Sequence, residues 1–167
     1  MIYVDMDGVV ADFDAGIQSL YGRSFETLDS SEQSMFWNSD CAAHRFFANL
    51  APIPEGIALV RGLLQSGLKF TFMTSTGGGK MHLNIAKQKL DFLSSVGISE
   101  SPVAFCLNTL SKAWFASENA ILIDDRQKVV DAWREAGGEA ILFTRENWES
   151  ILDRLLQYRN DVSITSP

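Results

Sequence analysis

Five short apolar segments alternate with longer amphipathic stretches along the chain. Each is rich in apolar residues on consecutive positions, as expected of strands that are buried on both faces of a sheet. The segments are Ile2–Val4, Phe70–Met73, Val103–Cys106, Ala120–Ile123 and Ala140–Phe143. Strands that alternate with helices predict an α/β fold, in which helices cover both faces of a five-stranded parallel sheet.

Four helices are expected between and after these strands. The first begins at Pro54 and ends before Gly67, and the second extends from about Met81 to Val96. Apolar residues at helical spacing predict the buried face of each helix. These faces are Ile57, Val60 and Leu64; then Leu83, Ala86, Leu90 and Leu93; then Val129, Trp133 and Ala136; and finally Trp148, Ile151, Leu152, Leu155 and Leu156.

The stretch from Phe13 to Leu50 interrupts the alternation, because it contains short helical patterns and no strand-like segment. It follows the first strand directly, and open α/β sheets bind ligands beyond the carboxyl ends of their strands. We therefore expect a small helical cap over the site. The predicted boundaries are 1–12 and 51–160 for the core domain, 13–50 for the cap and 161–167 for a frayed tail. Packing is favoured over ligand contact for the cap aromatics Phe36, Trp37, Phe46 and Phe47.

Composition limits the possible partners. The 167 residues suit one domain with an insertion, and the net charge of -7 argues against binding long nucleic acids through their phosphates. No apolar run approaches the ~20 residues that span a bilayer, so we expect a cytoplasmic protein without membrane contact. Cys41 and Cys106 are interpreted as buried hydrophobic residues. A monomer and a homodimer are both compatible with the sequence.

Two acids, Asp5 and Asp7, follow the first strand and precede Gly8. Residues i and i+2 of a strand project to the same side, so the two carboxylates begin on one face. Carboxylates this close repel each other, which raises one pKa and favours a divalent cation between them. The alternative is that the acids merely cap the end of the strand.

Three further segments add polar groups at the same edge of the sheet. Thr74 and Ser75 end the second strand before the glycine turn Gly77–Gly79, which suits a phosphate oxygen, although a flexible turn would look the same. Asp124 and Asp125 end the fourth strand, where a helix cap is the alternative. Adjacent side chains diverge, so one of these acids should face a metal and the other support it. Lys112 could balance the negative charge there.

The order of these motifs resembles that of the haloacid dehalogenase (HAD) phosphohydrolases, which have a three-layer Rossmann-like fold. Asp-x-Asp-Gly-Val, Thr-Ser, Lys and Asp-Asp occur in the expected order on the expected elements. Within that superfamily, Val4–Phe13 and the Leu-x-Pro-Ile-Pro element at Leu50–Pro54 are similar to those of the 5'(3')-deoxyribonucleotidases. The cap is shorter than in that family and matches it poorly, so the resemblance does not extend to base or sugar preference.

The resemblance implies a Mg²⁺-dependent phosphomonoesterase that acts on nucleoside 5'- or 3'-monophosphates through an aspartyl-phosphate. It assigns the nucleophile to Asp5, the general acid and base to Asp7, and the phosphoryl contacts to Thr74 and Lys112 with help from Ser75. The implied Mg²⁺ ligands are Asp5, the backbone carbonyl of Asp7, and Asp124, with Asp125 orienting a metal-bound water. Two alternatives stay open: a phosphatase for a sugar phosphate or another small phosphometabolite, and a catalytically inactive domain that binds phosphorylated ligands.

Overall fold

The computed structural model describes the backbone of residues 1–164 and the side chains of residues 1–158. Over this range, five parallel strands form one sheet in the order β3-β2-β1-β4-β5. The strands are β1 (Ile2–Val4), β2 (Phe70–Ser75), β3 (Val103–Cys106), β4 (Ile121–Asp124) and β5 (Glu139–Leu142). The predicted α/β class and the five predicted strands are therefore confirmed, with bounds that differ by one or two residues.

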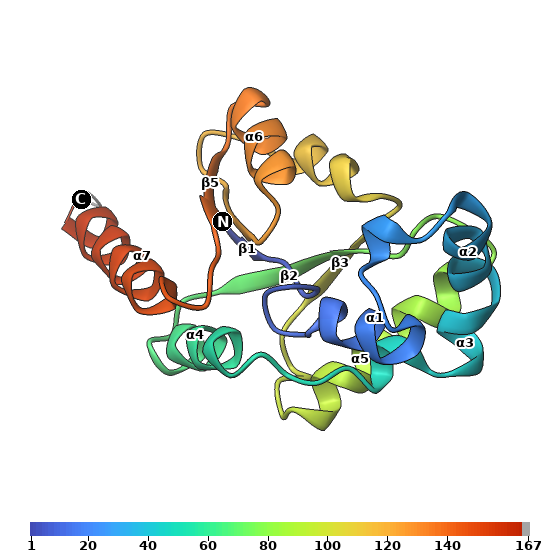
Figure 1. The fold of residues 1–167 in the computed structure, drawn as a ribbon. Coiled ribbons are helices and arrows are strands. Elements are labelled where there is room, and N and C mark those ends of the chain that lie inside the picture. Colours follow the sequence, from blue (N-terminus) through green and yellow to red (C-terminus); the bar gives the residue numbers. More distant parts are fainter. Residues whose placement is uncertain (165–167) are drawn as a thin grey trace.

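Helices cover both faces of the sheet (Figure 1). One side carries α4 (Pro54–Gln65), α5 (His82–Ser95) and α7 (Trp148–Ile164), and the other carries η4 (Thr109–Phe115) and α6 (Gln127–Glu135). Successive strand residues enter opposite cores: Val4 belongs to the larger hydrophobic cluster, and its neighbour Tyr3 packs against the smaller one. Within the described residues, no helix is both long and apolar enough to cross a membrane.

Three predicted helix faces need correction. In α6, Ala136 is exposed, and the buried residues are Val129, Val130 and Trp133. In α5, Leu83 and Leu90 are exposed, by 76% and 45%, because the buried face is rotated away from them. That face consists of Ile85, Gln88, Lys89, Phe92 and Leu93. In α4, Leu64 is exposed and Leu63 takes the buried position. The α7 face is confirmed at Ile151 and Leu155.

The C-terminal helix is longer than expected. Its backbone is helical up to Ile164, which includes the first four residues of the expected tail. Residues 165–167, the end of the expected tail, lie outside the described residues.

Between β1 and α4 the chain forms only short helices packed around aromatic rings. They are α1 (Phe13–Tyr21), η1 (Phe25–Thr27), α2 (Ser30–Met35), η2 (Phe36–Asp40), α3 (Cys41–Ala43) and η3 (Phe46–Ala48). Phe36, Phe46 and Phe47 are buried, and the Phe36 ring meets the Phe46 ring edge-to-face at 4.9 Å between centroids. Trp37 is only partly buried. Packing therefore accounts for the three phenylalanines and leaves Trp37 available for contact with a ligand.

The loop after β1 packs directly on α4. Ile53 donates its N–H to the carbonyl of Val10, and Asp12 donates to the carbonyl of Ala51. Gly56, in the first turn of α4, leaves no space for a side chain, because a Cβ there would lie 1.7 Å from the carbonyl oxygen of Val9. This contact fixes the loop that carries the acids of the first motif.

We expect Gly56→Ala to destabilise the protein by about 1–3 kcal/mol, since the added methyl must displace backbone rather than a side chain. Chemical denaturation monitored by circular dichroism measures this loss. The control is Gly79→Ala, because a Cβ at Gly79 meets no atom within 4 Å among the described residues. Equal stability of the two variants would show that α4 can move away from the loop at little cost.

Candidate active site

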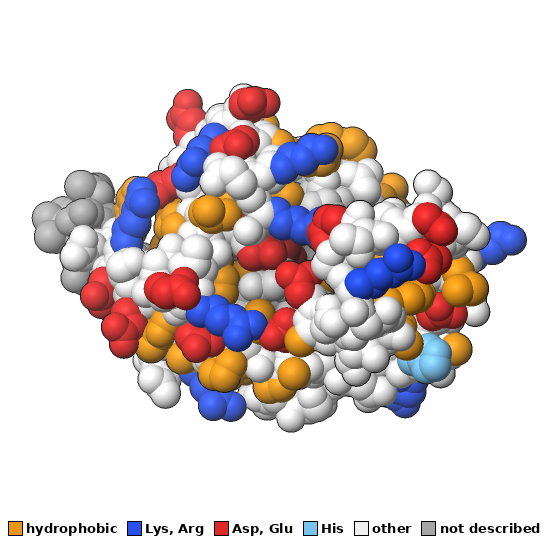
Figure 2. Space-filling view, viewed as in Figure 1, with side chains coloured by type: hydrophobic (Ala, Val, Ile, Leu, Met, Phe, Trp, Pro, Cys, Tyr) orange, Lys and Arg blue, Asp and Glu red, His pale blue; other side chains and the backbone are white. Residues whose placement is uncertain are grey.

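The predicted acids meet at one edge of the sheet. β1 and β4 are neighbours in the sheet, so the residues that follow them lie side by side. Asp5, Asp124 and Asp125 each place a carboxylate oxygen within 4.8 Å of the others. Figure 2 shows acidic side chains gathered in a hollow near the middle of this face. Helix connections run in opposite directions from β1 and β4, and open α/β sheets bind their ligands at such a switch point.

Gly8 allows this close approach. Its φ is +77°, a left-handed conformation that other residues seldom adopt. A Cβ at this position would lie 2.1 Å from Asp125 Oδ2, so a side chain would displace that carboxylate. Glycine is therefore required here both for the turn and for the contact between the two motifs.

Lys112 lies between the two acidic strand ends. It comes from η4, which Asn108 caps by accepting the N–H of Ser111, and its side chain is 1% exposed. Its Nζ is 2.6 Å from Asp5 Oδ2 and 2.7 Å from Asp124 Oδ2. Burial alone would lower the pKa of Lys112, but the two carboxylates outweigh burial and raise it, so the ammonium stays charged.

A second buried lysine, Lys89 on α5, was not predicted. Its side chain is 1% exposed, and its Nζ lies 2.5 Å from Asp7 Oδ2 and 2.6 Å from Thr74 Oγ1. The sequence did carry a signal. Ile85, Gln88, Lys89, Phe92 and Leu93 follow the i, i+3, i+4, i+7, i+8 spacing of one helix face. A lysine and a glutamine on such a face indicate a buried polar contact.

The two hydroxyl residues of β2 lie in different environments. Ser75 lines the cavity beside the acids, and its Oγ accepts the N–H of Gly77. Thr74 is fully buried, its Oγ1 accepts from Lys89, and it is not among the described residues that line this cavity. The structure therefore places Ser75, rather than Thr74, next to the space for a substrate.

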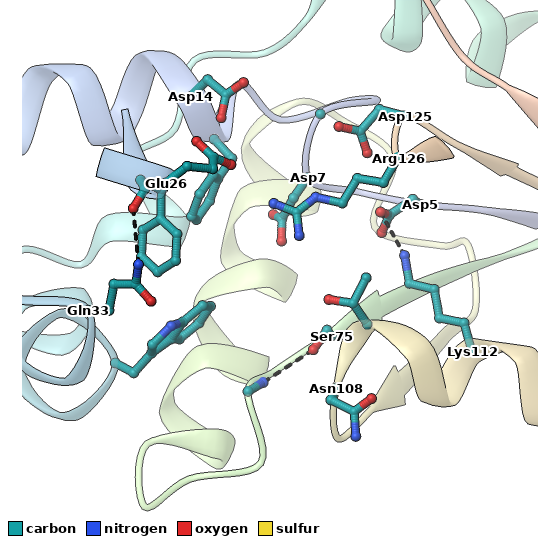
Figure 3. Close-up of a pocket in the computed structure, with 16 residues that line it drawn as sticks. Asp5, Asp7, Asp14, Glu26, Gln33, Ser75, Asn108, Lys112, Asp125 and Arg126 are labelled. Atoms are coloured by element: carbon teal, nitrogen blue, oxygen red, sulfur yellow. Dashed lines mark hydrogen bonds and ion pairs between the residues drawn. The ribbon is translucent and has the colours of Figure 1, made fainter. Parts of the chain in front are cut away.

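The cavity has a volume of about 490 Å³ and extends from the acids to the short helices between β1 and α4 (Figure 3). Phe13, Phe25 and Trp37 form an aromatic wall. Asp14 and Glu26 lie on the same side, whereas Arg126 extends across the cavity toward Asp7. An arginine here was not predicted, although it directly follows the Asp124-Asp125 pair. Such a cavity can take a small anion joined to a planar or polar group.

Burial perturbs the acids of the site. It raises the pKa of Asp125 to about 8 and that of Asp124 to about 6, and the negative charge of Asp5 acts in the same direction on both. The pKa of Asp7 is also raised, first by burial and then by Asp5, against the opposing effect of Lys89. A cation placed among these carboxylates would reverse the shifts.

The donor set fits a hard divalent cation. Four carboxylates face two buried lysines, which leaves an excess of negative charge when all four acids are ionised. Both oxygens of Asp124 are engaged, one by Lys112 and the other by the N–H of Arg126. By contrast, Asp125 Oδ1 is buried without a hydrogen-bond partner among the described residues. These contacts favour Asp125 over Asp124 as a ligand, the reverse of the roles predicted for the two adjacent acids.

Comparisons with known proteins identify the fold. No protein-family model and no curated protein matches the sequence. A haloacid dehalogenase-like family hydrolase from Streptococcus pneumoniae resembles the structure with a TM-score of 0.53 and 16% identity, over 86% of this chain and 83% of that one. A hydrolase from Pseudomonas syringae has a TM-score of 0.53 and 13% identity over 99% of each chain. A HAD-superfamily hydrolase from Ehrlichia chaffeensis gives 0.53 and 12%, over 93% and 95% of the two chains. The predicted HAD-like fold is confirmed.

The pKa shifts predict how stability depends on pH without metal. A carboxyl whose pKa is higher in the folded protein stabilises the fold fully below its unfolded pKa, 3.8 for aspartate, and loses that effect as the pH rises through its folded pKa. The free energy of unfolding in EDTA should therefore fall between roughly pH 4 and pH 8.5. Mg²⁺ should restore more stability at the upper end of this range.

Thermal unfolding across this pH range, with EDTA or with Mg²⁺, measures both effects. Asp125→Asn should flatten the upper part of the profile, because the amide does not titrate. Asp131→Asn is the matched control, since Asp131 is exposed on α6 and its nearest cation is Arg134 at 4.0 Å. Stability that rises with pH in EDTA would contradict the assignment of buried, proton-binding acids.

Proposed function

We propose that this protein is a metal-dependent phosphomonoesterase that uses Asp5 as its nucleophile. The observation that carries the proposal is the pairing of Asp5 with a buried, charged Lys112 beside the acids of β4. The ammonium pairs with Asp5 in a buried site and would offset the charge of an incoming phosphoryl group. Asp7, two residues along, supplies the second carboxyl group that acid–base chemistry requires.

Mg²⁺ is the proposed cofactor. Asp5 and Asp125 would hold it, together with the backbone carbonyl of Asp7, and Asp124 would support the site through its bonds to Lys112 and to the backbone of Arg126. When bound, the ion would neutralise phosphoryl oxygens and so favour attack by an anionic nucleophile.

The chain's own groups account for both halves of the reaction. A carboxylate oxygen of Asp5 attacks phosphorus, an Asp5–phosphorus bond forms, and the bond to the leaving oxygen breaks while Asp7 gives that oxygen a proton. A water then attacks the aspartyl-phosphate, passes its proton to Asp7, and releases inorganic phosphate and free Asp5. Ser75 and Lys112, which both line the cavity, would bind phosphoryl oxygens. A phosphoryl contact from Thr74 remains a prediction that requires its hydroxyl to turn from Lys89.

Nucleoside monophosphates are the proposed substrates, with deoxyribonucleotides suggested by the family resemblance. The segment 13–50 would act as a cap, and two rings of its aromatic wall, those of Phe25 and Trp37, would stack on the base. Asp14 and Glu26 on the same side would repel a second phosphate and can accept hydrogen bonds from the donors of a base. The same carboxylates can bind the hydroxyl groups of a sugar phosphate, which is the second candidate substrate.

Phosphate release is the direct test of the proposal. We expect turnover with Mg²⁺ for at least one class in a panel of deoxyribo- and ribonucleoside 5'- and 3'-monophosphates and sugar phosphates. Asp5→Asn should abolish it without changing the melting profile at low pH, because the amide cannot form the phosphoenzyme. Residual activity of Asp5→Asn at the wild-type rate would refute the covalent route. Bound Mg²⁺ with no turnover of any substrate would instead favour a phospholigand-binding domain.

Trp37→Ala tests the substrate class. Loss of base stacking, typically ~1–3 kcal/mol per base, should raise KM for a nucleoside monophosphate by roughly 5- to 150-fold. KM for a phosphate ester without a ring should change little. Trp114→Ala is the matched control, because Trp114 is 79% exposed and does not line this cavity. Equal effects of Trp37→Ala on both kinds of ester would point to a sugar or another small phosphometabolite.

A further inference from the structure

The function proposed above leaves Lys89 without a role. Its side chain is 1% exposed and lies between the sheet and the segment that follows α3, and burying a lysine is costly unless acceptors surround it. Two acceptors are present, Asp7 Oδ2 at 2.5 Å and Thr74 Oγ1 at 2.6 Å. The face of the Phe47 ring lies 4.7 Å from Nζ and adds a cation–π contact.

These contacts fix the lysine on every side. Thr74 belongs to β2, Asp7 follows β1, and Phe47 belongs to η3, so three separate segments enclose one ammonium group. The neighbouring Gln88 holds the same segment, because its Oε1 accepts the N–H of Phe47 and its Nε2 donates to the carbonyl of Cys41. The position of the ammonium is therefore set by packing and does not depend on a bound substrate.

The contact distinguishes the two oxygens of Asp7. An ammonium group only donates hydrogen bonds, so Oδ2 must act as the acceptor of Lys89. Asp7 Oδ1 is buried without a hydrogen-bond partner among the described residues. Asp7 itself lines the cavity, whereas Lys89 is not among the described residues that do. The lysine thus lies behind the acid, away from the space for the substrate.

We infer that Lys89 is a positioning residue for proton transfer by Asp7. It holds Oδ2 and so fixes the side-chain rotamer from which the carboxyl group of Asp7 exchanges a proton with the leaving group and with the attacking water. This role rests on the proposed phosphomonoesterase activity and on Asp7 as its acid. It does not involve binding of the phosphoryl group.

A role in proton transfer can be tested by comparing esters with different leaving groups. An alkoxide leaving group needs a proton from Asp7, whereas 4-nitrophenolate leaves without one. The ratio kcat/KM reports the steps up to transfer of the phosphoryl group to Asp5, and so excludes the later attack by water. Lys89→Met should therefore lower kcat/KM for a nucleoside monophosphate by about 10- to 100-fold, part of the ~10²–10⁴ typical of general acid catalysis. For 4-nitrophenyl phosphate we expect less than about a 3-fold change.

Three comparisons keep the test specific. Lys87→Met on the same helix is the matched control, because Lys87 is exposed and pairs only with Asp91 among the described residues. In an Asp7→Asn background, Lys89→Met should have no further effect on the nucleotide, since the group that it positions is already lost. The inhibition constant of inorganic phosphate should stay within about 2-fold of wild type, because Lys89 is not among the described residues that line the cavity.

Lys89→Gln is a second variant, which keeps the test valid if Lys89→Met fails to fold. Its amide can still donate to Oδ2, so it should recover part of the lost activity toward the nucleotide. An equal loss of kcat/KM for both esters, or a higher inhibition constant for phosphate, would overturn the positioning role. Lys89 would then be a structural or phosphate-binding residue. Failure of the wild-type protein to hydrolyse either ester would instead refute the proposed function, which separates the two conclusions.

Discussion

Like charges meet where β1 and β4 end, and a buried ammonium group, that of Lys112, lies within 2.7 Å of a carboxylate from each strand. Without it, the like charges of Asp5 and Asp124 would repel each other across neighbouring strands of the sheet. With it, Asp5, which is only 5% exposed, has a buried cation beside it. The nucleophile proposed for this site depends on this pairing. The cavity, Asp7 and the carboxylate of Asp125 lie around it.

The backbone around these charges allows almost no change. Gly8 brings the turn after β1 against the carboxylate of Asp125, and Gly56 brings α4 against the carbonyl of Val9. At both positions even a methyl group would collide, with the carboxylate of Asp125 at Gly8 and with the backbone of Val9 at Gly56. The acidic motif is therefore held from two directions: the β4 motif on one side and α4 on the other. Such rigidity suits a site that must keep four acids close in the absence of a ligand.

The sequence was sufficient to predict the strands, because short apolar runs buried on both faces have few other interpretations. It was also sufficient to bring Asp5, Asp124 and Asp125 to one edge, since parallel strands present their carboxyl ends together. It failed where polar residues occupy buried positions. Lys89 and Gln88 lie on the buried face of α5. The prediction considered only apolar residues, and it therefore assigned the exposed Leu83 and Leu90 to that face. The pattern of a helix does not tell which polar side chain will find a buried partner.

The buried polar residues of α5 connect residues 41–47 to Asp7. Gln88 holds the backbone at Cys41 and Phe47, and the next residue, Lys89, holds Asp7. Because both residues project from one rigid helix, residues 41–47 cannot move relative to the sheet without disturbing the ammonium that Asp7 accepts from. Phe25 and Trp37 lie in the stretch before these residues and are only partly buried. Under the proposed function, contact with a base would therefore involve the stretch before residue 41, whereas the position of Asp7 would depend on residues 41–47.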